Sequence, residues 1–382
     1  MSSSKRSDIT SFLLDSVASV EDVVDARWRR LKRRLGWTGQ PQIVAYTGYA
    51  NDRRAWLHGR VLTNPPKDLP DEDDGWWDNL TAMYQRIESD EVPGVEVAID
   101  FAGRRHVVTS DEEGYIRLEA DRHDLGPHHG LWTSAAMRIV GPADLKPDGH
   151  TVTIRLMTPQ PGASFGVISD VDDTVLQTGV VNLLTMARHT FFHNARTRKP
   201  LAGVAAWYRA LQGLDDRGTP NPIWYVSSSP WNLHDLLEDF LDLNGIPPGP
   251  LLLRDLGLGG RADTIGGHGH KLEKALRIMD AFPDLPFVLI GDSGQEDANL
   301  YASAAEQRPE SIRAIFIRDV DPDIASHRDD AVGAAIRRAE VVGVPMFLVA
   351  DSVAAFDHCV RLGLLTNAER SAVVADTRRD QD

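Results

Sequence analysis

The sequence predicts an α/β protein in which an amphipathic helix and a β-sandwich precede a parallel β-sheet. Three observations lead to this prediction. Apolar residues recur at helical spacing between residues 7 and 36. Short alternating or β-branched runs, separated by turn residues, extend from Gln42 to Pro159. Apolar runs then alternate with helical stretches, which is typical of βαβ units and a parallel sheet.

These patterns divide the chain into four parts, with the linker 159–162 between the second and the third. The predicted parts are an N-terminal helix at 1–40, a β-sandwich at 41–160, an α/β domain at 161–366 and a fraying polar tail at 367–382.

Composition narrows the classes of function. The chain has 382 residues with 41 Lys and Arg against 56 Asp and Glu, a formal net charge of −15. This balance disfavours a general nucleic-acid-binding protein, which gains affinity by neutralising phosphates. The single cysteine, Cys359, excludes an internal disulfide framework and a cysteine-based zinc cluster. Because neither a membrane-spanning run nor a secretory signal is seen, we expect a cytoplasmic protein.

The predicted N-terminal helix ends near Gly36 and carries a dense basic cluster in its last two turns. The cluster consists of Arg27, Arg29, Arg30, Lys32, Arg33 and Arg34. In one interpretation, the helix packs on the body of the protein with a solvated basic face. In the other, it makes peripheral contact with an anionic membrane surface.

The β-sandwich is predicted from alternating runs such as 56–62, 95–101 and 151–157, with Gly, Pro and Asp between them. The acidic run 71–74 has the wrong length and spacing for a calcium loop, so we interpret it as a solvated loop.

Six apolar runs predict the strands of the parallel sheet. These runs are 165–169, 223–226, 251–253, 287–290, 314–317 and 346–349. Ligands of such sheets bind at the carboxyl ends of the strands. Four polar features lie at or just after these ends, and they form the candidate site.

The first feature is the acidic segment that follows the first strand. Asp170 and Asp172 point to the same side of an extended segment, so both can face one site. Like charges this close repel each other unless a cation lies between them. The alternative is an Asp-rich turn that caps the next helix.

The second feature is the serine run that follows the second strand. Pro230 suits the first position of a helix, and Ser229 suits its N-cap. Ser227 then lies at the strand end, where its hydroxyl and nearby amides can hold a phosphoryl oxygen. Alternatively, the three serines only cap and turn.

The third feature is Lys271, which follows the Gly-rich loop 266–270 and begins a helix. A cation at a helix N-terminus is unfavourable, and a bound anion would offset the cost. The alternative is a tolerated surface lysine. The fourth feature places Asp292 at a strand end, with Glu296 and Asp297 soon after. Such acids suit a divalent cation, although they also suit a helix N-terminus.

In this order, the four features resemble the haloacid-dehalogenase-like superfamily of Mg-dependent phosphohydrolases. The segments 227–233, 269–271 and 289–297 are similar to the catalytic domain of the actin-patch-associated phosphatidate phosphatase family. The resemblance covers roughly residues 165–319. It implies a Rossmannoid parallel sheet with a minimal cap, Mg²⁺ as cofactor and phosphatidate as substrate.

The resemblance also implies roles for individual residues. Asp170 becomes the nucleophile that forms an aspartyl-phosphate, and Asp172 the general acid and then base. Ser227 and Lys271 hold the phosphoryl oxygens. The implied Mg²⁺ ligands are Asp170, Asp172 through its backbone carbonyl, Asp292 and, in preference to Glu296, Asp297. The expected substrate contacts are Thr174, Ser228, Ser229 and Trp231; Trp231 suits core packing equally well.

The sequence also predicts how open the site is, and it leaves two alternative functions. The spacings from Asp170 to Ser227 and on to Lys271 leave little chain for a large cap, so a lipid headgroup can enter. Residues 178–192 form either a small apolar flap or a plain core helix. The alternatives are a phosphatase of a soluble phosphomonoester and a non-catalytic phosphoacceptor or binding module.

Overall fold

The structure is a computed structural model, and it covers most of the chain. It describes residues 40–63, 91–121, 130–142, 149–171, 202–213, 218–254, 269–293, 296–320 and 327–381. Several predictions from the sequence fall outside these residues: the N-terminal helix with its basic cluster, the acidic run 71–74, Asp172, Thr174 and the segment 178–192. Within the described residues, the helices are all too short or too polar to cross a membrane.

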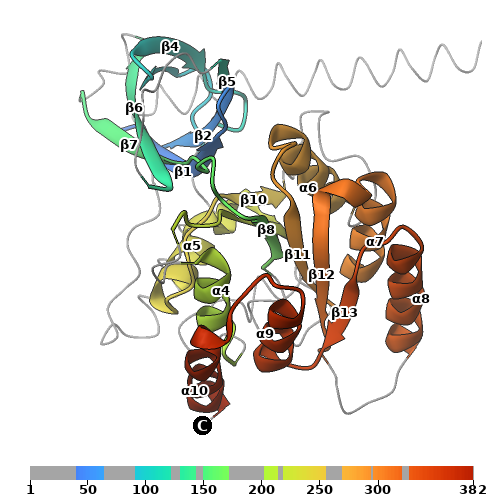
Figure 1. Ribbon diagram of the computed structural model, residues 1–382. Helices are drawn as coiled ribbons and strands as arrows, with labels where there is room; N and C mark the ends of the chain where they lie inside the picture. Colours follow the sequence, from blue (N-terminus) through green and yellow to red (C-terminus); the bar gives the residue numbers. More distant parts are fainter. Residues whose placement is uncertain are drawn as a thin grey trace, which may run out of the picture. The chain divides into compact units, whose positions relative to one another are not determined.

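Six parallel strands form the sheet of the C-terminal half, in the order β10-β9-β8-β11-β12-β13 (Figure 1). Their bounds are β8 Gly166–Asp170, β9 Ile223–Pro230, β10 Leu251–Arg254, β11 Phe287–Asp292, β12 Ile312–Arg318 and β13 Met346–Val349. All six were predicted, because strands buried on both faces are short, continuous apolar runs. The strand order reverses between β8 and β11, which is where sheets of this kind bind ligands.

Helices cover both faces of this sheet (Figure 1). They are α4 Val204–Gln212, α5 His234–Leu243, α6 Gly269–Ala281, α7 Asp297–Gln307, α8 His327–Val341, α9 Ser352–Arg361 and α10 Arg370–Gln381. Successive strand residues point to opposite faces. Accordingly, Val167 packs with residues of α4, α5, α9 and α10, whereas Ile168 packs with residues of α6, α7 and α8.

The prediction that residues 367–382 form a fraying tail is wrong. Residues 370–381 form α10, and Val373 on this helix is fully buried in the core. The polar composition of α10 was misleading, because its carboxylates are used inside the fold. Asp376 and Asp380 accept hydrogen bonds from backbone amides at the beginning of α4.

Seven strands form the sheet of the N-terminal half, in the order β4-β3-β6-β7-β1-β2-β5. Their bounds are β1 Gln42–Ala50, β2 Arg54–Leu62, β3 Glu96–Phe101, β4 Arg104–Thr109, β5 Tyr115–Asp121, β6 Trp132–Gly141 and β7 Thr151–Met157. Neighbours are antiparallel, except for β1 and β7. The edge strands β4 and β5 also contact each other, so the sheet curves around its own core. A β-rich first half is thus confirmed, and the sandwich assignment stays a prediction.

The two sheets share part of one buried core. Tyr49 and Met157 of the N-terminal sheet pack with Trp224 and Phe282. The Asn51 side chain donates a hydrogen bond to the carbonyl at the end of α6, at 2.7 Å. Residues 41–382 accordingly form one compact unit.

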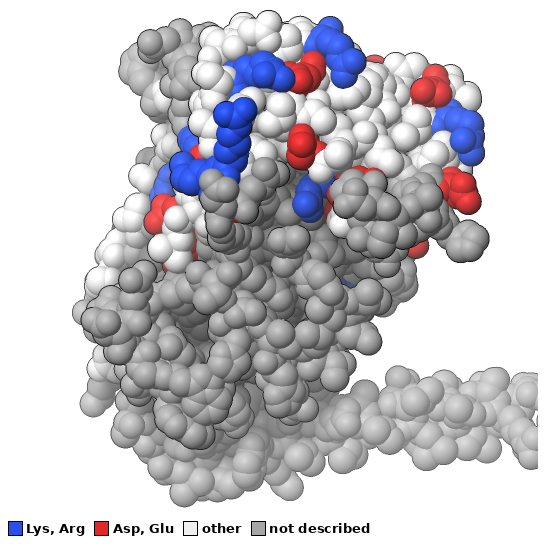
Figure 2. Space-filling model, turned by 90° about the horizontal axis from the view of Figure 1, so that it is seen from below, with Lys and Arg blue, Asp and Glu red and all other residues white. Residues whose placement is uncertain are grey.

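The surface drawn in Figure 2 mixes charges of both signs: Lys and Arg side chains lie among Asp and Glu side chains. Exposed ion pairs of the N-terminal sheet show the same interspersion, as between Arg54 and Glu119 at 2.6 Å. Each such pair contributes roughly 0–1 kcal/mol, so the surface charge does little to explain the fold.

Candidate active site

The strand registers bring the predicted acidic and hydroxyl residues to one edge of the parallel sheet. Asp170 ends β8 and lies opposite the residue that precedes Ser227 on β9. On the other side of β8, Asp292 ends β11, two residues beyond the partner of Ser169. Asp170, Ser227 and Asp292 are all fully buried. The edge is therefore a polar site enclosed by protein.

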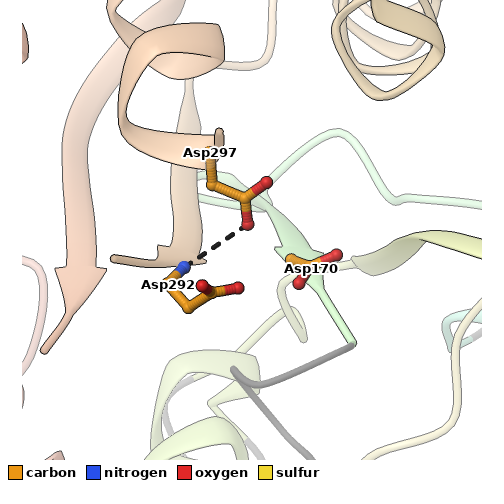
Figure 3. A group of neighbouring side chains, drawn as sticks. All are labelled: Asp170, Asp292 and Asp297. Carbon is orange, nitrogen blue, oxygen red and sulfur yellow. Dashed lines mark hydrogen bonds between the residues drawn. The ribbon is translucent and has the colours of Figure 1, made fainter. Parts of the chain in front are cut away.

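Three carboxylates gather at this edge, from Asp170, Asp292 and Asp297 (Figure 3). Asp297 is the first residue of α7, and one oxygen of each carboxylate lies within 4.8 Å of the others. The backbone amide of Asp292 donates to Asp297 Oδ2 at 3.4 Å. Glu296, the alternative ligand, is exposed. Buried carboxylate oxygens are the donors that Mg²⁺ prefers, so the residues present fit a divalent cation.

Gly291 explains how Asp297 approaches the end of β11. A Cβ atom added at Gly291 would lie 2.8 Å from Oδ2 of Asp297 and 2.8 Å from the ring of Tyr301. Side-chain carbons do not tolerate contacts this short. A larger residue at position 291 would therefore push the first turn of α7 away from the site.

Lys271 supplies a buried positive charge to the cluster. Its Nζ lies 2.7 Å from Asp170 Oδ1 and 3.0 Å from Asp297 Oδ1, and the side chain is fully buried. The two carboxylates provide the negative charge that a lysine at the beginning of α6 needs. If ionised, the three carboxylates and one ammonium leave two negative charges, which a divalent cation would balance.

The serine run differs in part from its prediction. Ser227 and Ser229 are buried, Ser228 is half-buried, and Ser227 Oγ accepts a hydrogen bond from the Ser229 amide at 2.9 Å. The helical segment begins one residue later than predicted, because β9 continues to Pro230. A 3₁₀ helix at Trp231–Leu233 then leads into α5, which begins at His234. The Ser227 hydroxyl thus satisfies the Ser229 amide within the serine run.

Trp231 lies against the N-terminal sheet. Its ring stacks on Tyr46 with centroids 4.8 Å apart, and His58 and His234 also contact it. The same side chain lines a groove of about 950 Å³ beside α6, together with Lys274. The structure therefore supports the packing interpretation of Trp231 and places it on a groove wall as well.

Two residues beside the site were missed by the sequence analysis. The Ser169 hydroxyl donates to the carbonyl of Asp170 at 2.7 Å, and it lies 2.7 Å from the hydroxyl of Tyr208. Tyr208 comes from α4, far from Asp170 in the sequence. No motif marks it, since only the packing of α4 on the sheet brings it to this place.

Comparisons with known proteins agree with this geometry. Residues 165–319 match the family described as phosphatidate phosphatase APP1, catalytic domain. Phosphatidate phosphatase APP1 of Saccharomyces cerevisiae is 29% identical over 290 residues, covering 72% of this chain and 47% of the yeast protein. An uncharacterised protein of Schizosaccharomyces pombe is 32% identical over 162 residues, covering 42% of this chain and 26% of that protein. The chain thus spans about half or less of the length of these curated relatives.

Similarity to solved structures is low. A carbohydrate acetylesterase from Xanthomonas citri has a TM-score of 0.25 and 10% identity, and the alignment covers 79% of this chain and 75% of that one. The matched segment 165–319, by contrast, contains the three carboxylates, Ser227 and Lys271. The segment that holds this site is thus similar to the catalytic domain of the phosphatidate phosphatase APP1 family.

Proposed function

We propose that this chain is a Mg²⁺-dependent phosphohydrolase that converts phosphatidate and water into diacylglycerol and phosphate. One observation carries the proposal: three buried carboxylates and a buried lysine meet at the carboxyl edge of a parallel sheet. This cluster lies in the segment that matches the phosphatidate phosphatase family, and the name of the yeast relative supports phosphatidate as the substrate. We assign the fold to the haloacid-dehalogenase-like superfamily on the same grounds.

In the proposed mechanism, Asp170 attacks the phosphorus atom and forms an aspartyl-phosphate. Lys271 holds the Asp170 carboxylate at 2.7 Å, which limits its rotation before attack. The bond from phosphorus to the glyceride oxygen breaks, and Asp172 gives that oxygen a proton. Asp172 then takes a proton from the water that hydrolyses the aspartyl-phosphate, which restores both carboxyl groups.

Asp170, Asp292 and Asp297 would hold the metal ion, with the backbone carbonyl of Asp172. Mg²⁺, when bound, neutralises carboxylate and phosphoryl oxygens. Ser227 lies buried on the neighbouring strand β9, one position beyond the partner of Asp170, where its hydroxyl can hold a phosphoryl oxygen.

Phosphatidate is an amphiphile, so the enzyme must meet it at an interface. We assign this contact to the basic cluster at residues 27–34, whose charge complements an anionic lipid surface. A phosphatase of soluble monoesters would not need such a cluster.

The test is Mg²⁺-dependent phosphate release from phosphatidate in mixed micelles, beside a panel of water-soluble phosphomonoesters. We expect turnover of phosphatidate, and we expect Asp170→Asn to lose at least about a thousandfold in kcat with an unchanged circular dichroism spectrum. Asp242→Asn, on the exposed face of α5, is the matched control. Turnover of soluble esters alone would refute the lipid substrate, and full turnover by Asp170→Asn would refute the nucleophile.

A further inference from the structure

A chain of hydrogen bonds runs from α4 to the backbone of Asp170. The Ser169 hydroxyl donates its one proton to the Asp170 carbonyl, at 2.7 Å. The Tyr208 hydroxyl, 2.7 Å from Ser169 Oγ, must therefore be the donor to Ser169. Both side chains are fully buried. Burial raises the pKa of Tyr208 well above its ordinary value of 10.0, so the phenol retains the proton that it donates.

These hydrogen bonds act at the point where the backbone leaves the sheet. Asp170 is the last residue of β8, so a hydrogen bond to its carbonyl holds the peptide plane just beyond the strand. A fixed peptide plane limits rotation about the bond between Cα and the carbonyl carbon. The carboxylate of Asp170 then stays directed at Lys271, the partner that it meets at 2.7 Å.

The C-terminal helix in turn holds α4. The backbone amides of Gly203 and Ala206 donate to Asp380 Oδ2 and Asp376 Oδ2, each at 3.0 Å. The N-cap residue of α4 provides no side-chain cap of its own. The two carboxylates of α10 therefore satisfy amides that lack partners within α4, and their charge suits the helix N-terminus.

We propose that Tyr208 and Ser169 are positioning residues for Asp170, and that the two capping carboxylates of α10 keep Tyr208 in place. Helix α10 lies outside segment 165–319, which matches the catalytic-domain family. The geometry of the site thus depends on a helix beyond that segment. This inference rests on the proposed function, in which Asp170 is the nucleophile.

Two buried tyrosines provide a matched comparison. Tyr208→Phe is expected to lower kcat about tenfold with KM changed less than about twofold, because it disturbs the geometry of attack and not substrate binding. Tyr225→Phe is the control: its buried hydroxyl donates to the carbonyl of Pro247 at 2.6 Å, and its ring packs on Tyr208. It removes an equivalent hydrogen bond from the same core and is expected to leave kcat unchanged.

A double-mutant cycle tests whether the hydroxyl groups act in series. Ser169→Ala should lower kcat as much as Tyr208→Phe does, and the double variant should lose no more than either single variant. If the kcat of the double variant fell by the product of the two single losses, the two hydroxyl groups would act independently and the proposed series would be overturned. Equal losses of kcat in Tyr208→Phe and Tyr225→Phe would overturn the positioning role, because general damage to the core would then explain both.

The contribution of α10 is tested by removing one cap. Asp376→Ala is expected to lower kcat severalfold with KM unchanged. Asp357→Ala is its control, because it breaks the ion pair between α9 and Arg370 of α10 at 2.7 Å and leaves α4 untouched. Equal kcat in Asp376→Ala and the wild type would overturn the role of α10.

A second readout is independent of activity. Amide hydrogen exchange in a peptide covering residues 166–171 should be faster in Tyr208→Phe and Asp376→Ala than in the wild type, and unchanged in both controls. If the wild type hydrolysed no phosphomonoester, the proposed function would fail. The hydrogen-exchange rates would still show whether Tyr208 holds the backbone at Asp170. Unchanged exchange in Tyr208→Phe would overturn the proposal.

Discussion

Replacing Lys271 by Met tests the electrostatics of the carboxylate cluster. The ammonium is fully buried and lies 2.7 Å from Asp170 and 3.0 Å from Asp297. Methionine keeps an unbranched apolar stem and removes the charge, so three buried carboxylates lose this counter-charge. Removing one partner of a buried pair costs about 3–5 kcal/mol. We expect Lys271→Met to lower the free energy of unfolding by this amount in the absence of metal.

A second substitution, Asp297→Asn, shows whether charge is the cause of this loss, because its effect on the free energy of unfolding should change sign between two backgrounds. In the wild type, Asp297→Asn removes a partner of the buried ammonium, and we expect it to destabilise the protein. In the Lys271→Met background, the same substitution removes one of three mutually repelling carboxylates. We therefore expect Asp297→Asn to stabilise that variant, by about 1–2 kcal/mol.

The assay is urea unfolding at pH 7 in the presence of a chelator, followed by circular dichroism. Arg277→Met, further along α6, is the control for loss of a cation, and its exposed side chain, which pairs with Glu273 at 3.4 Å, predicts a change under about 1 kcal/mol. If Asp297→Asn destabilised both backgrounds equally, the two charges would be independent and the reasoning would be refuted.

Three further predictions concern other parts of the structure. Gly291→Ala should lower phosphate release more than about tenfold, because the added carbon displaces Asp297; wild-type rates would contradict this. Burial, with positively charged neighbours, lowers the pKa of His58 from its ordinary value of 6.5 to about 4. The folded protein thus binds this proton less readily than the unfolded chain, so the associated stability is complete above pH 6.5 and is lost as the pH falls towards 4. In urea titrations between these pH values, His58→Gln should reduce that loss by up to about 3 kcal/mol, whereas an unchanged slope would exclude His58 as its source. Arg60→Leu should cost about 1–3 kcal/mol in the same assay at pH 7, because the buried guanidinium pairs with Glu91 at 2.9 Å; a loss near zero would show that the pair contributes nothing.

Much of the parallel sheet and of its site can be predicted from local sequence patterns. A strand buried on both faces must be a short apolar run, so β8 and β11 are visible without tertiary information. Parallel strands end at a common edge, so Asp170, Asp292 and Ser227 were expected to meet there. The structure confirms that these three residues share this edge.

Tertiary structure decided which side chains pair with each other and where the polar helix α10 packs. Lys271 was expected to contact an anion, and only the packing of α6 and α7 identifies Asp170 and Asp297 as its partners. Helix α10 was mistaken for a fraying tail, because its apolar stripe is weak and its carboxylates bind α4. The contact between Tyr208 and Ser169 likewise depends on tertiary packing, here of α4 on the sheet. Patterns of local hydrophobicity encode which residues are buried, whereas hydrogen bonds between distant segments depend on a packing geometry that no local pattern contains.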